Sequence, residues 1–395
     1  MRRLLSISTL YPAAPRPGFG RFVARQMEAL AARGDWQVTV INPIGLPPLL
    51  PLRRYAPLRA IPARGTVEGV DIHHPRFALL PGLSGRFNPA LIARAVLPLA
   101  RRLHAQNPFD IVDAQFFYPD GPAAARIAAE LGLPLAIKAR GSDIHYWGTR
   151  PPALAQMRDA AEQAGGLLAV SRALGDDMAA LGLPAARMHT HYTGLDRARF
   201  FPRPRDAARA QITRDLGVPA DGPLLVSVAA LIAIKGQALA IRALTQPGLE
   251  RARLVLAGTG ADGPALRQLA ADLGLAARVH LVGALDHDAM PLLLSAADVM
   301  VLPSEREGLA NAWIEALACG TPVVIPDIGG AREVVTSSAA GRLAPRDPAA
   351  IAQSLVDVLA HPVPQTETAA CAAAFSWEAN ATRLSEIYAG VAAGR

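Results

Sequence analysis

Short apolar runs alternate with helix-length amphipathic segments through most of the chain, and this alternation constrains the fold more than any other feature. Short apolar runs are typical of strands buried on both faces of a parallel sheet. The longer amphipathic segments between them are typical of the helices that connect parallel strands. We therefore expect an α/β fold built from repeated strand–helix units.

The alternation stops and restarts near the middle of the chain, which predicts two domains of similar size. The strands expected in the first half are Leu4–Ser8, Val38–Asn42, Ile111–Ala114, Leu135–Ala139 and Leu167–Ser171, with helices at Phe22–Arg33, Leu91–Gln106, Gly121–Leu131 and Arg172–Leu181. The strands expected in the second half are Leu224–Val228, Leu254–Ala257, Val279–Val282, Val299–Leu302 and Val323–Ile325, with helices at Gln237–Leu244, Pro264–Leu273, His287–Ala296, Asn311–Cys319 and Ala349–Ala360. A proline-rich stretch at 43–89 is expected to be irregular or hairpin-like.

A strand-free segment rich in Arg, Pro and Asp, Leu195–Gly217, separates the two halves. We place one Rossmann-like domain at 1–197, a hinge at 198–217 and a second Rossmann-like domain at 218–374. A last helix at 375–395 is expected to cross back to the first domain. Ligands of doubly wound sheets bind beyond the carboxyl ends of the strands, so both domains should face a central cleft.

Charge is unevenly distributed along the chain. Forty Lys and Arg side chains against 33 Asp and Glu leave a net charge of +7, but residues 1–200 carry 24 basic and 14 acidic side chains, a net +10. Such a basic half suits an anionic membrane surface or a phosphate-bearing acceptor. A solvated face in an arginine-biased chain explains the charge equally well. Nucleic acid is not expected, because no known binding motif accompanies the arginines.

The cysteine content and the hydropathy pattern bear on the compartment. Cys319 and Cys371 have no metal-ligand spacing, and two cysteines suit a reducing compartment. The apolar run in Met1–Leu10 is short and rich in hydroxyl residues, so we interpret it as a strand rather than a signal peptide. No run reaches the ~18 apolar residues of a membrane span. We expect a cytoplasmic protein that can lie peripherally on the inner face of the membrane.

The segment Ser304–Val324 carries the most specific chemistry of the chain. It predicts a charged loop, a helix with Asn311 as its N-cap, and a stop at Gly320. The expected helix start would direct four backbone amides at an anion, those of Gly308, Leu309, Ala310 and Asn311. Two carboxylates flank these amides: Glu307 on the loop and Glu315 about one turn into the helix.

This segment resembles the acidic signature of the retaining glycosyltransferases of family 4. The shared pattern is Glu307, seven residues, Glu315, and then Ala316-Leu317-Ala318-Cys319-Gly320-Thr321-Pro322. The resemblance extends to the Gly258, Val279–Gly283 and Asp327–Val335 segments, and favours a subgroup of the teichuronic-acid or cell-surface polysaccharide type. It implies a GT-B fold with an N-terminal acceptor domain and a C-terminal nucleotide-sugar donor domain.

The resemblance also implies roles for the marked residues. Glu307 would hold the donor sugar, and Glu315 would accept the ribose hydroxyls. Lys235 would neutralise the leaving diphosphate together with the amides at 308–311. The family usually has an arginine five residues before this lysine, whereas this chain has Ala230.

A dinucleotide-like fingerprint, Gly258-Thr259-Gly260-Ala261-Asp262-Gly263, suggests NAD when taken by itself. It follows the second strand of its domain, however, whereas the dinucleotide fingerprint belongs to the first strand–helix turn. We therefore interpret Gly258 as a turn residue near the nucleotide base, and we place Val282 in the same donor-binding set.

Three residues of the first half are candidates for ligand contact. Gly20 lies in a glycine-containing loop between the first strand and the first helix, where backbone amides can approach a phosphate. Arg140 and Asp143 follow the fourth strand and are candidates for contacts with the acceptor or the donor sugar. Many family members have a histidine where this chain has Arg140. A structural role explains each of the three residues nearly as well.

Together these features predict a retaining, metal-independent hexosyltransferase. A hexose would pass from a UDP- or GDP-sugar, which is a substrate rather than a cofactor, to a hydroxyl of a glycan or lipid-linked acceptor. No metal site is expected, and the diphosphate would be balanced by Lys235, arginines and helix N-termini rather than by a divalent cation. The alternatives are a nucleotide-sugar epimerase of the same fold and a non-catalytic nucleotide-sugar binding protein.

Overall fold

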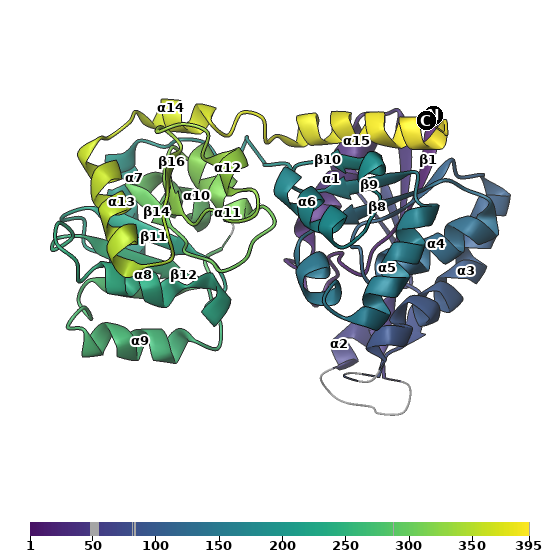
Figure 1. Ribbon diagram of the computed structural model, residues 1–395, viewed down its shortest axis with the longest axis horizontal. Coiled ribbons are helices and arrows are strands. Elements are labelled where there is room, and N and C mark those ends of the chain that lie inside the picture. The colour runs from purple at the N-terminus through teal and green to yellow at the C-terminus, as the bar shows by residue number, and fades with distance from the viewer. Residues whose placement is uncertain (48–54, 81, 83, 287, 395) are drawn as a thin grey trace. The chain divides into compact units, whose positions relative to one another are not determined.

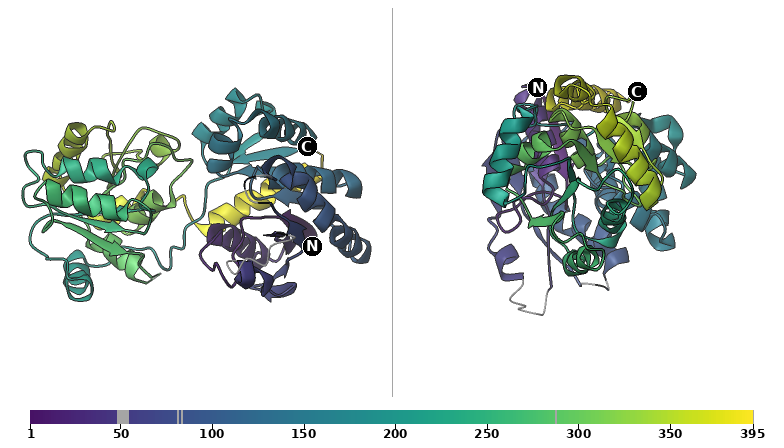
Figure 2. Two further views of the ribbon diagram at one scale, coloured as in Figure 1. Left: turned by 90° about the horizontal axis from the view of Figure 1, so that it is seen from below. Right: turned by 90° about the vertical axis from the view of Figure 1, so that its left-hand side faces the viewer.

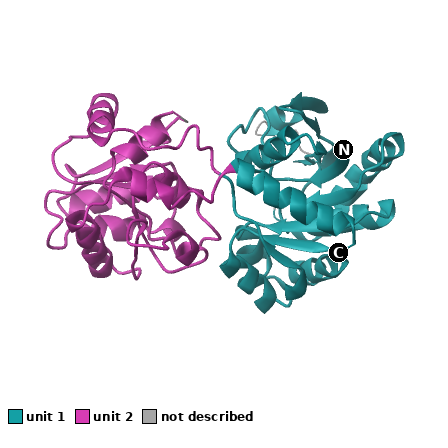
Figure 3. Cartoon of the chain, turned by 90° about the horizontal axis from the view of Figure 1, so that it is seen from above, with its two compact units in different colours: residues 1–194, 377–395 teal, residues 195–376 magenta. Residues whose placement is uncertain are grey.

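The computed structural model describes residues 1–47, 55–80, 82, 84–286 and 288–394, and these residues form two compact units. Unit 1 comprises Met1–Gly194 and Trp377–Arg395, and unit 2 comprises Leu195–Ser376 (Figure 3). Each unit has its own largely parallel sheet with helices packed on it, so the predicted α/β fold with two Rossmann-like domains is confirmed.

Two segments show how the chain divides. The C-terminal helix α15 (Trp377–Ala392), for which we expected a return to the first domain, is part of unit 1. The segment 198–217, which we expected to be a hinge, belongs to unit 2. It contains the helix α7 (Arg205–Leu216), which packs against α10 (Ala289–Ala296).

The main sheet of unit 1 has eight strands in the order β10-β9-β8-β7-β1-β2-β5-β4. Its neighbouring strands pair in parallel, except that β4 runs antiparallel to β5. The bounds are β1 Arg2–Ile7, β2 Trp36–Ile41, β4 Arg64–Val67, β5 Val70–His73, β7 Ile111–Ala114, β8 Leu135–Ala139, β9 Gly166–Ala169 and β10 Met188–Thr190. Within the proline-rich 43–89 stretch, part of which lies outside the described residues, β4 and β5 form a hairpin. There β3 (Ile44–Leu46) and β6 (Arg76–Ala78) also form a separate parallel pair.

Two helices far apart in sequence cover one face of this sheet. The yellow α15 lies beside the purple α1 (Arg21–Ala32) in Figures 1 and 2, and both contribute to one apolar core. In that core the Trp36 indole N–H donates to Ser385 Oγ at 2.9 Å, and its ring meets Tyr388 edge-on at 5.9 Å. The segment from Trp377 onward therefore completes the core of unit 1.

The remaining helices of unit 1 include a layer on the opposite face, formed by α3, α4 and α5, which pack in sequence (Figure 1). Their bounds and those of the shorter helices are α2 Ala56–Arg59, η2 Gly85–Phe87, α3 Asn88–Gln106, α4 Asp120–Leu131, η3 Asp143–Trp147, α5 Pro151–Gln163, α6 Arg172–Ala180 and η4 Ala185–Arg187. Among the described residues of the chain, no helix is both long enough and apolar enough to cross a membrane.

Unit 2 has a six-stranded parallel sheet in the order β13-β12-β11-β14-β15-β16. Its strands are β11 Leu224–Val228, β12 Arg253–Ala257, β13 Val279–Gly283, β14 Val299–Val301, β15 Val323–Ile325 and β16 Gly341–Leu343. Its other helices are η5 Ala233–Lys235, α8 Gln237–Ala243, α9 Gly263–Asp272, α11 Asn311–Ala318, α12 Ala331–Val334, α13 Pro348–Ala360 and α14 Gln365–Ala370. The helix expected at His287–Ala296 is α10, which begins at Ala289, and His287 itself lies outside the described residues.

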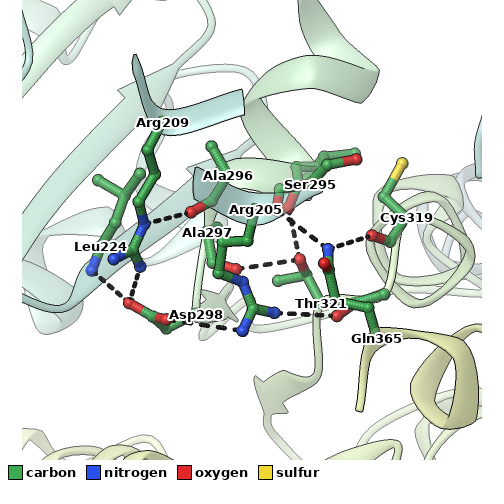
Figure 4. A network of polar contacts seen from close by, with 12 residues as sticks. Arg205, Arg209, Leu224, Ser295, Ala296, Ala297, Asp298, Cys319, Thr321 and Gln365 are labelled. Carbon is green, nitrogen blue, oxygen red and sulfur yellow. Dashed lines mark hydrogen bonds and ion pairs between the residues drawn. The ribbon is translucent and has the colours of Figure 1, made fainter. Parts of the chain in front are cut away.

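A carboxylate at the start of β14 holds α7 on this sheet (Figure 4). Asp298 accepts hydrogen bonds from the guanidinium of Arg209 and, at 2.8 Å, from the backbone amide of Leu224. Arg205 lies 3.8 Å from the same carboxylate and donates to the carbonyl of Gly320 at 3.2 Å. Asp298 therefore links the 198–217 segment to two strands and to the end of α11.

We expect the Asp298→Asn substitution to lower the free energy of unfolding by about 1–3 kcal/mol, because two partly buried donors lose a charged acceptor. Urea unfolding measures this change. Asp221→Asn is the matched control, since Asp221 also binds an arginine, Arg253 at 2.8 Å, but its side chain is 66% exposed. Equal destabilisation by both substitutions would contradict the anchoring role of Asp298.

Candidate functional site

The loops that follow β11 and β14 bring an oppositely charged pair together in unit 2. Lys235 ends the short helix η5 after β11, and Glu307 lies on the loop between β14 and α11. Neighbouring parallel strands have their carboxyl ends at the same edge of the sheet, so these loops meet although they lie far apart in sequence. The Lys235 Nζ donates to Glu307 Oε1 at 2.5 Å, and the carboxylate side chain is only 11% exposed.

Close backbone packing fixes the two loops against each other. Gly236 has a φ of 71°, and a Cβ at this position would lie 2.2 Å from the carbonyl oxygen of Pro303. Nearby, the amide of Glu305 donates to the carbonyl of Ile234 at 2.7 Å. Only glycine fits at position 236, because a side chain there would displace the loop that carries Glu307.

Two further glycines, Gly329 and Gly330, contact the loop that carries Glu307. A Cβ on Gly329 would lie 2.0 Å from the carbonyl oxygen of Glu307, and the amide of Gly330 donates to the carbonyl of Gly308 at 2.8 Å. In the sequence, these two glycines are marked only by the family resemblance of the Asp327–Val335 segment. Their contacts show that they hold the loop in front of α11.

The start of α11 differs by one residue from the expectation. Asn311 is the first helical residue and Ala310 the N-cap, with no side-chain cap, so the predicted N-cap role of Asn311 is wrong. The first turn of a helix leaves backbone N–H groups without intrahelical acceptors and carries a partial positive charge. Leu309, Ala310 and Asn311 lie at this end of the helix, next to Gly308 and Glu307, and their contact with a phosphate stays a prediction.

Glu315 lies one turn into α11, in surroundings that disfavour its charge. Burial raises the pKa of its carboxyl to about 7, and the positive charge of Arg199 opposes this rise. Arg199 precedes α7 and also forms an ion pair with Asp288 at 3.1 Å. Arg199 could not be assigned to Glu315 from the sequence, because it lies more than a hundred residues before it.

The remaining donor-side candidates lie on neighbouring strands of unit 2. Gly258 has a φ of 146°, its amide donates to the carbonyl of Gly283 at 2.7 Å, and a Cβ on it would lie 1.9 Å from the carbonyl oxygen of Ala229. Glycine is therefore required at position 258, because the loop after β11 packs directly against it. Val282 is partly exposed in β13. The carbonyl of Ala230 accepts from Gln237 Nε2 at 3.0 Å.

Of the candidates of unit 1, Gly20 ends the loop between β1 and α1, and Arg140 follows β8. Gly20 is the N-cap of α1 with a φ of 69°, and a Cβ there would lie 2.5 Å from the carbonyl oxygen of Leu10. Arg140 donates through Nε to the carbonyl of Gln115 at 3.1 Å and through a terminal nitrogen to Gln115 Oε1 at 2.6 Å. Burial lowers the pKa of the Arg140 guanidinium to about 10.

The Asp143 side chain is enclosed by backbone amides and is not exposed to a ligand. Its two carboxylate oxygens accept backbone amide hydrogen bonds at 2.7–3.1 Å from Phe117, Arg140, Gly141 and Ile144. The side chain is completely buried, and burial raises the pKa of its carboxyl. These amides occupy the lone pairs that a sugar hydroxyl would need. The Asp143 carboxylate therefore holds the backbone around β8 rather than a ligand.

Lys138, which with Lys235 makes up the two lysines of the chain, has surroundings that its sequence neighbours do not indicate. Lys138 is completely buried in β8, where its Nζ donates to Gln26 Oε1 at 2.9 Å and lies 2.5 Å from His191 Nδ1. Burial and the nearby charge of Arg140 hold the pKa of this amine well below its usual value. Lys138 thus belongs to the interior of unit 1 and does not line an open edge of the sheet.

Residues 208–374 match the family described as Glycosyl transferases group 1, and residues 18–194 match the Glycosyl transferase 4-like domain. A D-inositol 3-phosphate glycosyltransferase of Catenulispora acidiphila is 29% identical over 98% of this chain and 95% of its own. TuaC of Bacillus subtilis, named for teichuronic acid biosynthesis, is 28% identical over 89% and 88%. A GDP-mannose-dependent phosphatidylinositol monomannoside mannosyltransferase of Mycolicibacterium smegmatis is 30% identical over 68% and 73%.

Solved structures share the fold over the whole chain. Sucrose-phosphate synthase from Thermosynechococcus elongatus is 22% identical, with a TM-score of 0.79 and complete coverage of both chains. The Anabaena protein HepE in complex with UDP-glucose is also 22% identical, with a TM-score of 0.66 over 100% of this chain and 99% of its own. Both likenesses support the GT-B arrangement of two Rossmann-like domains.

The raised pKa of Glu315 predicts a pH-dependent stability. The folded protein disfavours the carboxylate, so the wild-type chain should lose stability as the pH rises from about 4.5 to about 7. The lower limit is the ordinary pKa of a glutamate, and the upper limit is the raised pKa of Glu315 in the folded protein. The Glu315→Gln variant should lack this loss and exceed wild type by roughly 2–3 kcal/mol at pH 8. Urea unfolding between pH 4.5 and 8 measures the difference.

The exposed Glu367 of α14 provides the control, since its Glu367→Gln variant should follow the wild-type curve at every pH. A constant offset between Glu315→Gln and wild type across this range would contradict the raised pKa.

Proposed function

Because the chain belongs to the glycosyl transferases of group 1, the family-4 glycosyltransferases, we propose that it transfers a hexose from a nucleoside diphosphate sugar to an acceptor hydroxyl. The donor is a UDP- or GDP-sugar, and the acceptor is a glycan or a lipid-linked molecule of cell-surface polysaccharide or glycolipid synthesis. Relatives named for GDP-mannose use and for teichuronic acid biosynthesis, and the fold neighbour with UDP-glucose, support this choice.

The Lys235–Glu307 pair is the observation that carries the proposal. Its 2.5 Å contact places one cation and one carboxylate beside the N-terminus of α11. Lys235 and the amides of 308–311 bind the diphosphate. Because Ala230 stands where the family usually has an arginine, Lys235 supplies the positive charge of the loop after β11. Glu307 accepts hydroxyl hydrogens of the donor sugar, and Glu315 accepts those of the ribose.

The reaction proceeds with retention, by displacement on the face of the sugar that the diphosphate leaves. The acceptor oxygen bonds to the anomeric carbon while the bond from that carbon to the diphosphate oxygen breaks. The acceptor proton passes to an oxygen of the departing phosphate, so no side chain has to serve as a base. Lys235 and the helix N-terminus stabilise the negative charge that develops on the leaving group.

The protein works in the cytoplasm without a cofactor. The arginine-rich first half, with its net +10 over residues 1–200, favours contact with the anionic inner face of the membrane, where lipid-linked acceptors are held. In unit 1, Gly20 contributes to donor binding through its loop, and Arg140 contacts the acceptor or the donor sugar.

Glu307→Gln should lower the rate of sugar transfer by at least about 100-fold, because the neutral amide removes a charged partner of the donor sugar and of Lys235. Glu305→Gln is the matched control from the same loop, since its side chain is 51% exposed and its ion pair, with Arg306, has a distance of 3.5 Å. The assay follows release of UDP or GDP from UDP-glucose and GDP-mannose. Full activity of the Glu307→Gln protein would refute the proposed site.

Chelation tests the proposed independence from metal ions. Treatment with EDTA should leave the transfer rate within twofold of the untreated enzyme, because Lys235 and the start of α11 supply the positive charge for the diphosphate. A loss of activity that added Mg²⁺ or Mn²⁺ restores would show that a divalent cation takes part.

A further inference from the structure

Two apolar cavities lie on either side of the loop that follows β1 in unit 1. The first, which we call the Phe77 cavity, has a volume of about 340 Å³ and is bounded by this loop, β3, β6 and α2. The second, which we call the Glu28 cavity, has a volume of about 320 Å³ and reaches α1 and β5. Tyr11, Ala13 and Ile61 line both cavities, so these side chains form a common wall. Volumes of this size are typical of sites for small organic molecules.

The lining of the Phe77 cavity favours hydrocarbon over sugar. Its described walls include Ile44, Leu58, Ile61, Phe77 and Leu79, with Thr9 and Asn42 among the few polar side chains. The amide of Asn42 is already directed at the carbonyl of Tyr11, 3.4 Å away. A hexose in such a cavity would lose its hydrogen bonds to water without finding enough partners, whereas an alkyl or aromatic group loses none.

The only charged side chain among the described residues that line the Phe77 cavity is that of Arg16. Its guanidinium lies 6.0 Å from the ring of Phe19, which is 45% exposed, and no carboxylate of the described chain pairs with it. In the Glu28 cavity the charged groups do have partners. Glu28 pairs with Arg25 at 3.1 Å, and Arg64 pairs with Asp71 at 3.1 Å. Among the described residues that line the Phe77 cavity, Arg16 is therefore the cation available to a ligand.

We propose that the Phe77 cavity binds the apolar portion of an amphipathic anion, with Arg16 pairing with the adjacent negative group. The chemical class is a hydrocarbon or aryl group joined to a phosphate. The identification of this ligand with the sugar acceptor rests on the proposed function; the binding site itself does not. Because the loop after β1 lies at the carboxyl end of a central strand of the sheet, it is at the edge where ligands of such sheets bind.

Isothermal titration with octyl phosphate below its micellar concentration tests the site on the full chain. Leu79→Ser should weaken binding at least tenfold, because it places a hydroxyl in the cavity wall. Leu80→Ser is the matched control, since Leu80 is the next residue, is 47% exposed and does not line the cavity. Ala13→Leu fills the cavity instead of making it polar, and it should weaken binding as well. This second variant keeps the test valid if Leu79→Ser fails to fold.

The pairing of Arg16 with the negative group of the ligand is tested separately. Arg16→Gln should weaken octyl phosphate at least fivefold but leave neutral octyl glucoside unchanged, and Arg94→Gln, on the exposed side of α3, should change neither. Comparison of octyl phosphate with phenyl phosphate distinguishes a hydrocarbon chain from an aryl group as the preferred apolar portion. Equal affinity of Leu79→Ser and wild type, or binding of inorganic phosphate as tight as that of octyl phosphate, would overturn the proposal.

Nucleotide binding separates this proposal from the proposed function. Leu79→Ser should bind UDP and GDP as wild type does, because its site lies in unit 1 and Lys235 and Glu307 lie in unit 2. A protein that binds octyl phosphate in the Phe77 cavity but neither binds nor turns over a nucleotide sugar would refute the glycosyltransferase activity and leave the cavity site standing.

Discussion

Parallel pairing of strands is the constraint on which both units depend. It places the carboxyl ends of neighbouring strands at one edge of each sheet, so loops separated by 70 or more residues of sequence can meet there. In unit 2 this edge joins Lys235 to Glu307. In unit 1 it brings the loop after β1 beside Asn42, at the end of β2. The chemistry of each unit is thus concentrated at one edge of its sheet.

Close backbone packing makes that edge precise. Gly236, Gly258 and Gly329 each leave room for a carbonyl oxygen of another loop where a Cβ would approach to about 2 Å. The loops are therefore positioned by backbone contacts, and the charged side chains they carry need not hold them in place. In the proposed function, this division would let Glu307 and Lys235 exchange partners for a ligand without loosening the loop structure.

Much of this arrangement could be predicted from sequence, for identifiable reasons. Ten of the strands followed from apolar runs, Glu307 and Glu315 from a dense motif after a strand, and Lys235 from its place in a strand-to-helix loop. The N-cap of α11 was misplaced by one residue because Asn is usually the better cap. The surroundings of Asp143 and Lys138 were not predictable, because backbone amides and side chains such as His191 reach them through tertiary packing. The same holds for Arg199 near Glu315 and for α7 within the expected hinge.

The membership of α15 in unit 1 has a consequence for biosynthesis. Unit 2 is contained in one continuous stretch, Leu195–Ser376, whereas unit 1 needs Leu384, Ile387, Tyr388 and Val391 to close its core over Trp36. On the ribosome, the first 194 residues therefore emerge with one sheet face covered only in part, by α1, and unit 2 has its full sequence before unit 1 does. The usual order, in which the N-terminal domain is finished first, is reversed for this chain.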